Sequence, residues 1–175
     1  MKKIALTLLI GFACMPGHAQ VKGDYFLAGT YTNGKSLGIY TFQFDPSTQS
    51  ARQVAVTEGI RNPSYLAVAP GGGFVYAVSE LNGGGDAGKV VAYRYDAASG
   101  KLGFINEQPS GGDDPCYVTI DNTGKWVIVG NYSSGSLAVL PVESNGALGK
   151  AVTRIVHEGP MGPNTARQEK PHVHC

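Results

Sequence analysis

The chain has 175 residues, of which 42% are hydrophobic and 15% charged, and its formal net charge is +1. This composition is that of an ordinary globular protein of about one domain, which excludes disorder along the whole chain. The near-zero charge and the scattered lysines and arginines leave no basic stripe for a nucleic-acid backbone and no polybasic patch for anionic lipid. We therefore expect a small-molecule partner, with neither nucleic acid nor membrane bound by the mature chain.

The N-terminal residues have the features of a secretory signal peptide. Lys2 and Lys3 precede an apolar run over residues 4–13, and small residues at 17–19 offer a cleavage site. The run is shorter than the about 20 apolar residues that span a bilayer. We predict a signal peptide over residues 1–19 and a periplasmic or secreted protein. The alternative is a cytoplasmic protein in which this run forms a buried strand.

The rest of the chain has the pattern of an all-β protein. Short runs rich in Val, Ile, Tyr and Phe alternate with clusters of Gly, Asn, Asp, Ser and Pro, as is typical of strands separated by turns. No segment has convincing helical periodicity. The expected strands cover residues 24–32, 38–45, 53–59, 63–69, 74–81, 89–96, 102–108, 115–121, 126–133, 136–142 and 151–157.

An internal repeat indicates how these strands are organised. The segments NPSYLAVAPGGGFVYAVSE and KVVAYRYDAASGKLGFINE are echoed by DPCYVTIDNTGKWVIVGNY and SLAVLPVESNGALGKAVTRI. Each copy holds four strands and begins at a proline, and Pro63, Pro115 and Pro171 lie 52 and 56 residues apart. Four strands per roughly 50 residues is the period of a β-propeller blade. We therefore predict a β-propeller built of four-stranded antiparallel blades.

Each end of the mature chain holds part of a blade. Three strands precede the first copy without a Pro-led one, and residues 171–175 begin an innermost strand in the register of the two earlier copies. A propeller needs about four to eight blades, whereas about three are encoded here. We therefore expect residues 20–175 to form an incomplete propeller domain, a fragment without its C-terminal blades. Such a fragment is expected to be poorly stable, because its end blades expose apolar faces.

Two cysteines remain after the predicted cleavage, which is too few for a disulfide scaffold. Their spacing also matches no zinc motif. Cys116 is expected to be a small buried residue, and the sequence leaves open whether it pairs with Cys175.

Two histidines depart from the repeat. His174 takes a position that is aliphatic in both earlier copies, where Leu66 and Val118 stand. His172 lies two residues before it, so strand alternation places both imidazoles on one face. Two imidazoles on one face of an innermost strand indicate a chemical role, although hydrogen-bonded or exposed histidines at a chain end are the simpler alternative.

The connection that leads to these histidines is unusually long and polar. It spans 23 residues from Leu148 to Pro171, against 13 residues from Leu102 to Pro115. Long loops of this kind more often carry function than act as spacers. Close to the two histidines, within eleven residues, it gathers Asn164, Arg167, Gln168 and Glu169.

Six motifs of the mature chain match one known family. They are GTYT at 29–32, NPSYLAVAP at 62–70, VYAVSE at 75–80, DPCYVTID at 114–121, GNYSSGSLAVLPV at 130–142 and GPNTARQEKPHVH at 162–174. In these motifs the chain resembles the seven-bladed lactonases, which include one type of 6-phosphogluconolactonase and the fungal carboxymuconate-lactonising enzymes. The resemblance implies a seven-bladed propeller, a substrate at one mouth of its central channel, and no metal or organic cofactor.

The resemblance also implies which residues form the site. Its catalytic candidates are Arg167, Glu169, His172 and His174. Lactone hydrolysis needs a base to take a proton from water and a cation to hold the charge that develops on the carbonyl oxygen. An imidazole suits the first task and a guanidinium the second. Glu169 would orient a histidine or accept the proton itself, and either histidine is a candidate for the base.

The substrate-binding candidates are Asn131, Tyr132 and Gln168. Asn131 and Tyr132 belong to the GNY motif beside the channel mouth, and Gln168 lies within the RQE sequence. Glu80 ends the second strand of its copy as Asn131 ends its own, so either side chain is a candidate to face the channel.

The function expected from the resemblance is hydrolysis of a sugar or sugar-acid lactone, as part of carbohydrate metabolism. The alternatives are a muconate-type lactonising enzyme and a propeller that binds a ligand without catalysis, because a fold alone does not determine function. Export favours an unphosphorylated aldonolactone, since phosphorylated sugar lactones are cytoplasmic. A truncated chain would lack channel residues, so whether this chain acts as an enzyme stays open.

Overall fold

The computed structural model describes residues 24–83 and 87–175. The predicted signal peptide lies outside the described residues. Within them the chain is all-β, with no helix, and therefore no helix that could cross a membrane. The eleven strands are β1 (Asp24–Ala28), β2 (Gly38–Asp45), β3 (Ser50–Glu58), β4 (Leu66–Val68), β5 (Phe74–Ser79), β6 (Lys89–Asp96), β7 (Lys101–Pro109), β8 (Pro115–Ile120), β9 (Trp126–Asn131), β10 (Ser136–Pro141) and β11 (Thr153–Val156).

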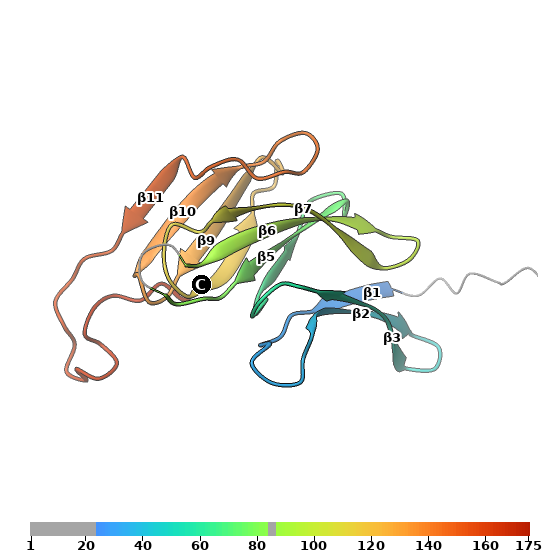
Figure 1. Ribbon diagram of the computed structural model, residues 1–175, viewed down its shortest axis with the longest axis horizontal. Coiled ribbons are helices and arrows are strands. Elements are labelled where there is room, and N and C mark those ends of the chain that lie inside the picture. The colour runs from blue at the N-terminus through green and yellow to red at the C-terminus, as the bar shows by residue number, and fades with distance from the viewer. Residues whose placement is uncertain (1–23, 84–86) are drawn as a thin grey trace, which may run out of the picture.

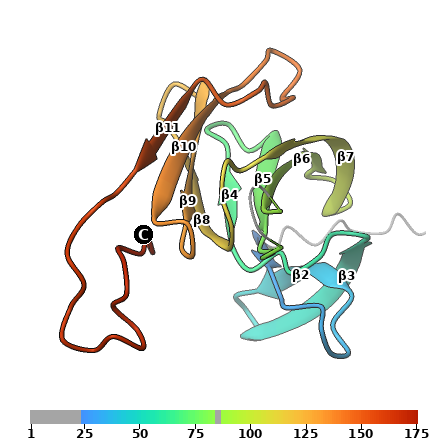
Figure 2. The same ribbon diagram turned by 60° about the vertical axis from the view of Figure 1, so that its left-hand side comes forward.

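The strands form three antiparallel sheets in chain order. The first sheet has the order β1-β2-β3, the second β4-β5-β6-β7, and the third β8-β9-β10-β11. Figures 1 and 2 show the three sheets side by side, as successive blades of a propeller are. The predicted four-stranded blades are confirmed in the second and third sheets, and the predicted three-stranded start is confirmed in the first.

β5 of the second sheet is apolar along nearly its whole length because the first sheet covers one of its faces and the third sheet covers the other. Five of the six residues of β5 are buried, as are four of the six in β9 and four of the eight in β6. One apolar core joins the second and third sheets around Tyr76 and Leu140, and a smaller one joins the first and second sheets around Ile39. The blades are therefore held together mainly by packing between sheets.

Three hairpin turns contain an aspartate that accepts hydrogen bonds from its own turn. Hydroxyl donors lower the pKa of each carboxyl: Ser47 acts on Asp45, Ser99 on Asp96, and Thr123 on Asp121. The effect is largest at Asp121, whose pKa is lowered to about 2 by Thr123 and by the backbone N–H groups of the turn. The turns therefore prefer an ionised aspartate.

We predict that Asp121→Ala destabilises the chain more at neutral pH than in acid. The folded pKa is depressed below the ordinary value of 3.8, so the stabilisation is present above 3.8 and is lost as the pH falls towards 2. Urea unfolding at about pH 6 and about pH 3 measures this, with the difference between wild type and variant expected to shrink in acid. Asp24→Ala, which removes an exposed carboxylate outside any turn, is the control. A difference of the same size at both pH values would contradict the role of the ionised Asp121.

The expected strand at 171–175 is not present, which corrects that prediction. These residues have no regular structure and instead lie beside β8, where the Cys116 thiol contacts their backbone carbonyls. A strand needs the backbone of a neighbouring strand as its hydrogen-bond partner, and within the described part of the chain no strand pairs with residues 171–175. The strand predicted at 63–69 is likewise shorter, since β4 covers only Leu66–Val68.

Candidate functional site

The segment after β11 carries the predicted site residues back to the third sheet. It leaves the edge of that sheet as a long loop that turns back (Figure 1), and its end contacts Cys116 of β8. The Cys116 thiol donates to the carbonyl oxygens of Val173 and His174, at Sγ to O distances of 3.5 and 3.3 Å. The histidines are thereby held against the third sheet.

Two glycines of the third sheet allow this close approach. A Cβ at Gly130 would lie 3.0 Å from the Cγ1 atom of Val173. At Gly135 it would lie 2.3 Å from the carbonyl oxygen of Pro171, and the φ angle of +56° there also favours glycine. The sequence around β9 and β10 therefore leaves space for the returning segment.

His172 is fixed through both of its ring nitrogens. Its Nδ1 atom lies 3.0 Å from the backbone oxygen of Tyr132, and its Nε2 atom lies 3.2 Å from Oε1 of Glu169. Its ring also stacks on the Tyr132 ring at a centroid distance of 4.3 Å. The pKa of Glu169 is lowered by a hydrogen bond from its own backbone N–H and, less strongly, by His172. Glu169 therefore contacts His172, which is the geometry that the first of its two predicted roles, orienting a histidine, needs.

His174 is placed differently. Its ring contacts Tyr132 edge-on, with the centroids 5.8 Å apart and the ring planes at 86°. It is exposed and, with Arg167, lines a cavity of about 420 Å³. Tyr132 therefore contacts both histidines, and His174, unlike His172, lines this cavity together with Arg167.

This cavity lies beyond the ends of β1, β5 and β9. Glu80 directly follows β5 as Tyr132, and not Asn131, directly follows β9, and Tyr31 lies three residues after β1, so each sheet contributes one side chain from beyond the end of a strand. The site is thus built by the repeat together with the loop after β11. The complete lining is Tyr31, Ser64, Glu80, Cys116, Tyr132, Arg167 and His174.

Glu80 is the carboxylate of this cavity, and two hydroxyl groups bind it. The Tyr31 hydroxyl lies 3.0 and 2.9 Å from its two oxygens, and the Ser64 hydroxyl donates to Oε2. Burial raises the pKa of Tyr31, and the hydrogen bond to Glu80 adds to this. Asn62 supports the group, because its amide oxygen accepts from Thr32 and its amide nitrogen donates to the Glu80 carbonyl.

Two predicted substrate-binding residues do not line the cavity. Asn131 is fully buried, and its amide nitrogen donates to the Ser110 carbonyl at 3.0 Å and to the Ser136 hydroxyl at 3.3 Å. Gln168 accepts the Asn164 N–H through Oε1 at 2.9 Å and thereby closes the turn that presents Arg167. Both side chains hold the backbone around the site, while Tyr132 lines it as expected.

Sequence reasoning did not assign Tyr31 or Ser64 to the site. The signals were present, because Tyr31 belongs to the GTYT motif and Ser64 follows its proline as Cys116 and His172 follow theirs. Cys116 was expected to be buried, whereas it is only partly buried and lines the cavity. Cys116 and Cys175 both carry free thiols, so the structure shows no disulfide between them.

We predict that Cys175 reacts with iodoacetamide faster than Cys116 at about pH 8. Burial raises the pKa of the Cys116 thiol, and the nearby carboxylate of Glu80 raises it further. Less of Cys116 is then the reactive thiolate at a given pH, whereas Cys175 is exposed. Peptide mass spectrometry after timed labelling separates the two sites. Equal rates would contradict the burial of Cys116 under the returning segment.

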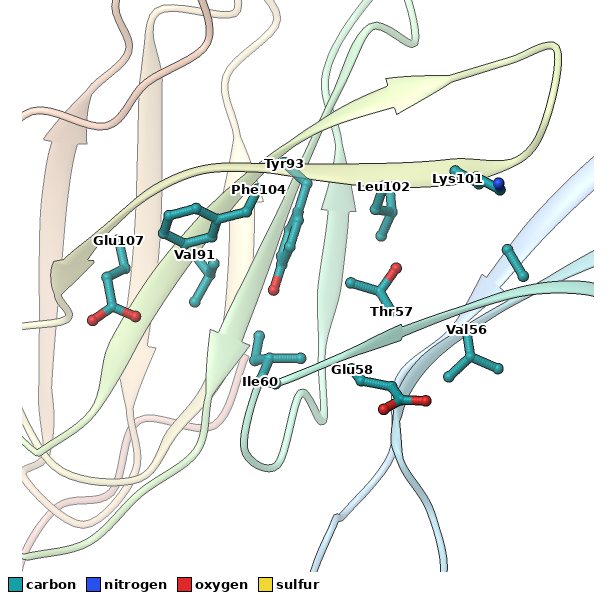
Figure 3. Close-up of a pocket in the computed structure, with 12 residues that line it drawn as sticks. Val56, Thr57, Glu58, Ile60, Val91, Tyr93, Lys101, Leu102, Phe104 and Glu107 are labelled. Carbon is teal, nitrogen blue, oxygen red and sulfur yellow. The ribbon is translucent and has the colours of Figure 1, made fainter.

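A larger cavity of about 510 Å³ lies between the first and second sheets, away from these residues. Figure 3 shows Val91, Tyr93 and Leu102 pointing from the second sheet toward the first. Its lining includes Lys101 and two glutamates but no histidine and no arginine. It therefore lacks the base and the guanidinium that the cavity beside Tyr132 brings together.

A model of the lactonase seven-bladed β-propeller family matches residues 25–175. The chain belongs to this family. The match covers all three sheets and the loop that carries Arg167 and the histidines, so the fold and the candidate site both lie within the lactonase region.

Similar proteins with names in the lactonase family agree with the family assignment. The chain is 38% identical over 146 residues to a 6-phosphogluconolactonase of Bacillus subtilis, covering 83% of this chain and 40% of that protein. A Bacteroides fragilis structure, provisionally named a 6-phosphogluconolactonase, is 41% identical with a TM-score of 0.80, over 86% of this chain and 41% of the other. A periplasmic gluconolactonase of Pseudomonas aeruginosa is 36% identical with a TM-score of 0.71, over 78% and 40%. The chain thus spans about two fifths of the length of the relatives it matches.

No cluster of three or more His, Cys, Asp or Glu side chains placed to hold a metal ion occurs in residues 24–83 and 87–175. That lactonase chemistry here needs no cofactor stays a prediction.

Proposed function

We propose that the protein hydrolyses the ester bond of a sugar or sugar-acid lactone in the cavity lined by His174 and Arg167. The observation that carries this proposal is the convergence of an imidazole, a guanidinium and a hydroxyl-bound carboxylate, Glu80, on one cavity. The names of the lactonase relatives support the same chemistry.

His174 is the proposed base. Its imidazole takes a proton from water, and the water oxygen attacks the lactone carbonyl carbon. The Arg167 guanidinium holds the negative charge that develops on the carbonyl oxygen. The ring C–O bond then breaks, the leaving alkoxide takes the proton back from the imidazolium, and a hydroxy acid results.

His172 is the proposed positioning residue. Both of its ring nitrogens are already engaged, by the Tyr132 carbonyl and by Glu169, and its ring stacks on Tyr132. It therefore orients Tyr132, against whose ring His174 lies edge-on. In this assignment Glu169 acts through His172 and does not take a proton from water.

The wider setting of the site is also part of the proposal. Residues 20–175 form the front part of a propeller domain, with the cavity at one mouth of the channel, and the protein acts in carbohydrate metabolism. A signal peptide over residues 1–19 would send it to the periplasm, as the location of the Pseudomonas aeruginosa gluconolactonase suggests. The substrate is then an unphosphorylated aldonolactone. Cell fractionation tests the location, and a cytoplasmic protein would contradict it.

Replacement of Arg167 tests the proposed chemistry in the whole protein. Arg167→Ala is expected to lower kcat for D-glucono-1,5-lactone by about 10²- to 10³-fold, because a donor to the developing oxyanion is lost. Arg167→Lys keeps the charge without the planar fork and should retain part of the rate. Arg52→Ala, which removes a guanidinium from β3, is the matched control. Unchanged kcat in Arg167→Ala would overturn the assignment, and a protein that binds the lactone without hydrolysing it would be a binding propeller.

A further inference from the structure

We propose that Tyr31, Glu80 and Ser64 form a subsite that recognises the hydroxyl groups of the lactone ring and so determines substrate specificity. This inference rests on the proposed function and names the part of the cavity that selects the substrate class. Tyr31 follows β1 of the first sheet, and Ser64 and Glu80 flank β4 and β5 of the second, whereas the proposed reacting groups, His174 and Arg167, lie on the segment after β11.

In this cluster the Glu80 carboxylate is held in place to accept hydrogen bonds from hydroxyl groups. Both carboxylate oxygens of Glu80 already accept from the Tyr31 hydroxyl, and one accepts from Ser64. An ionised carboxylate has about four lone-pair sites, so acceptor positions remain for a ligand. The Tyr31 and Ser64 oxygens retain lone pairs as well. All three side chains line the cavity, and the Glu80 backbone is held by Asn62.

The carboxylate at the Glu80 end of the cavity, away from the role proposed for Arg167, favours a neutral, hydroxylated part of the ligand. Hydrogen bonds from ligand hydroxyls to an ionised carboxylate are charge-assisted and stronger than those between neutral groups. A lactone that carries carboxylates, as muconate-type lactones do, would bring like charge towards Glu80. An unsubstituted ring lactone would gain nothing from the cluster. The arrangement therefore selects polyhydroxylated lactones over both other classes.

The test compares two lactones of equal ring size in the whole protein. D-glucono-1,5-lactone carries ring hydroxyls, and δ-valerolactone has none. Glu80→Gln keeps the size of the side chain but removes its charge and one acceptor. We expect kcat/KM for gluconolactone to fall by about 10- to 100-fold, mainly through KM, because a hydrogen bond to a charged group is lost. We expect kcat/KM for δ-valerolactone to change less than about twofold.

Two further variants keep the test sharp. Tyr31→Phe removes one hydroxyl from the same cluster. It should lower the ratio of kcat/KM for gluconolactone to kcat/KM for δ-valerolactone, by a smaller factor than Glu80→Gln does. Glu143→Gln removes an exposed carboxylate in the turn after β10 and should leave both substrates unaffected. Equal loss on both lactones in Glu80→Gln would place Glu80 in the chemistry and overturn the specificity role, as would no loss on either.

A failure of the proposed function is separable from a failure of this inference. If the wild type hydrolyses neither lactone, binding of 1,5-anhydroglucitol, a hydroxylated ring without a carbonyl group, is measured by calorimetry. Binding that weakens at least about tenfold in Glu80→Gln would support a hydroxyl-recognising site without catalysis. Binding that is absent, or equal in both proteins, would overturn it.

Discussion

His174→Ala is expected to lower kcat for D-glucono-1,5-lactone by about 10²- to 10⁴-fold, because it removes the proposed general base. His172→Ala is expected to cost less, since both ring nitrogens of His172 bind the protein itself. Its loss should raise KM and lower kcat together, through a misplaced Tyr132. Steady-state kinetics of both variants in the whole protein measure how the loss divides between kcat and KM.

His157→Ala is the matched control, because this histidine also lies on the segment after β11 but does not line the cavity. Glu169→Gln should resemble His172→Ala if Glu169 acts through that imidazole. A larger kcat loss in His172→Ala than in His174→Ala would exchange the two roles. No loss in either variant would remove both histidines from the reaction.

Tyr76→Ala is expected to lower the free energy of unfolding by about 3 to 5 kcal/mol, as large aromatic deletions in packed cores do. Tyr76 is fully buried in the core between the second and third sheets, and its hydroxyl donates to the Gly146 carbonyl at 3.1 Å. Burial raises its pKa to about 12. One side chain thus joins β5 to the hairpin after β10, and its removal leaves a cavity between two blades.

Urea denaturation followed by circular dichroism measures this loss. Tyr76→Phe keeps the ring and should cost only about 1 kcal/mol, the usual contribution of one hydrogen bond. Phe104→Ala removes an aromatic ring that is 64% exposed and should cost less than about 1 kcal/mol. Equal effects of Tyr76→Ala and Phe104→Ala would contradict the packing between the second and third sheets as a main source of stability.

The fold could be predicted from the sequence because the four-strand pattern of a blade occurs more than once along the chain. Each strand is short, bounded by turns that contain glycine, proline or aspartate, and apolar where neighbouring sheets cover it. The turn residues and the repeat period therefore predict the same strand boundaries. The prediction was wrong at residues 171–175, where the sequence has the pattern of a strand but no strand in the described part of the chain pairs with it. A strand forms only where a neighbouring strand can pair with it, and the residue pattern of one segment does not show whether such a neighbour is present.

The candidate site was predictable only in part. Arg167 and His174 stood out because they depart from the repeat in a long polar loop. Tyr31 and Ser64 did not, since a tyrosine and a serine near strand ends are also common in turns. Asn131 was placed next to Tyr132 by its motif, but alternation along the chain turns neighbouring side chains to opposite faces, and Asn131 faces Ser110 inside the protein.

The most direct test is hydrolysis of D-glucono-1,5-lactone by the whole protein, followed by acid release in weak buffer and corrected for the spontaneous reaction. Wild type is compared with a His172→Ala, His174→Ala double variant whose fold is verified by circular dichroism. We predict saturable hydrolysis by the wild type and a rate indistinguishable from the spontaneous one in the double variant. Equal rates in the two proteins, or no acceleration by the wild type, would contradict a lactonase site at this cavity.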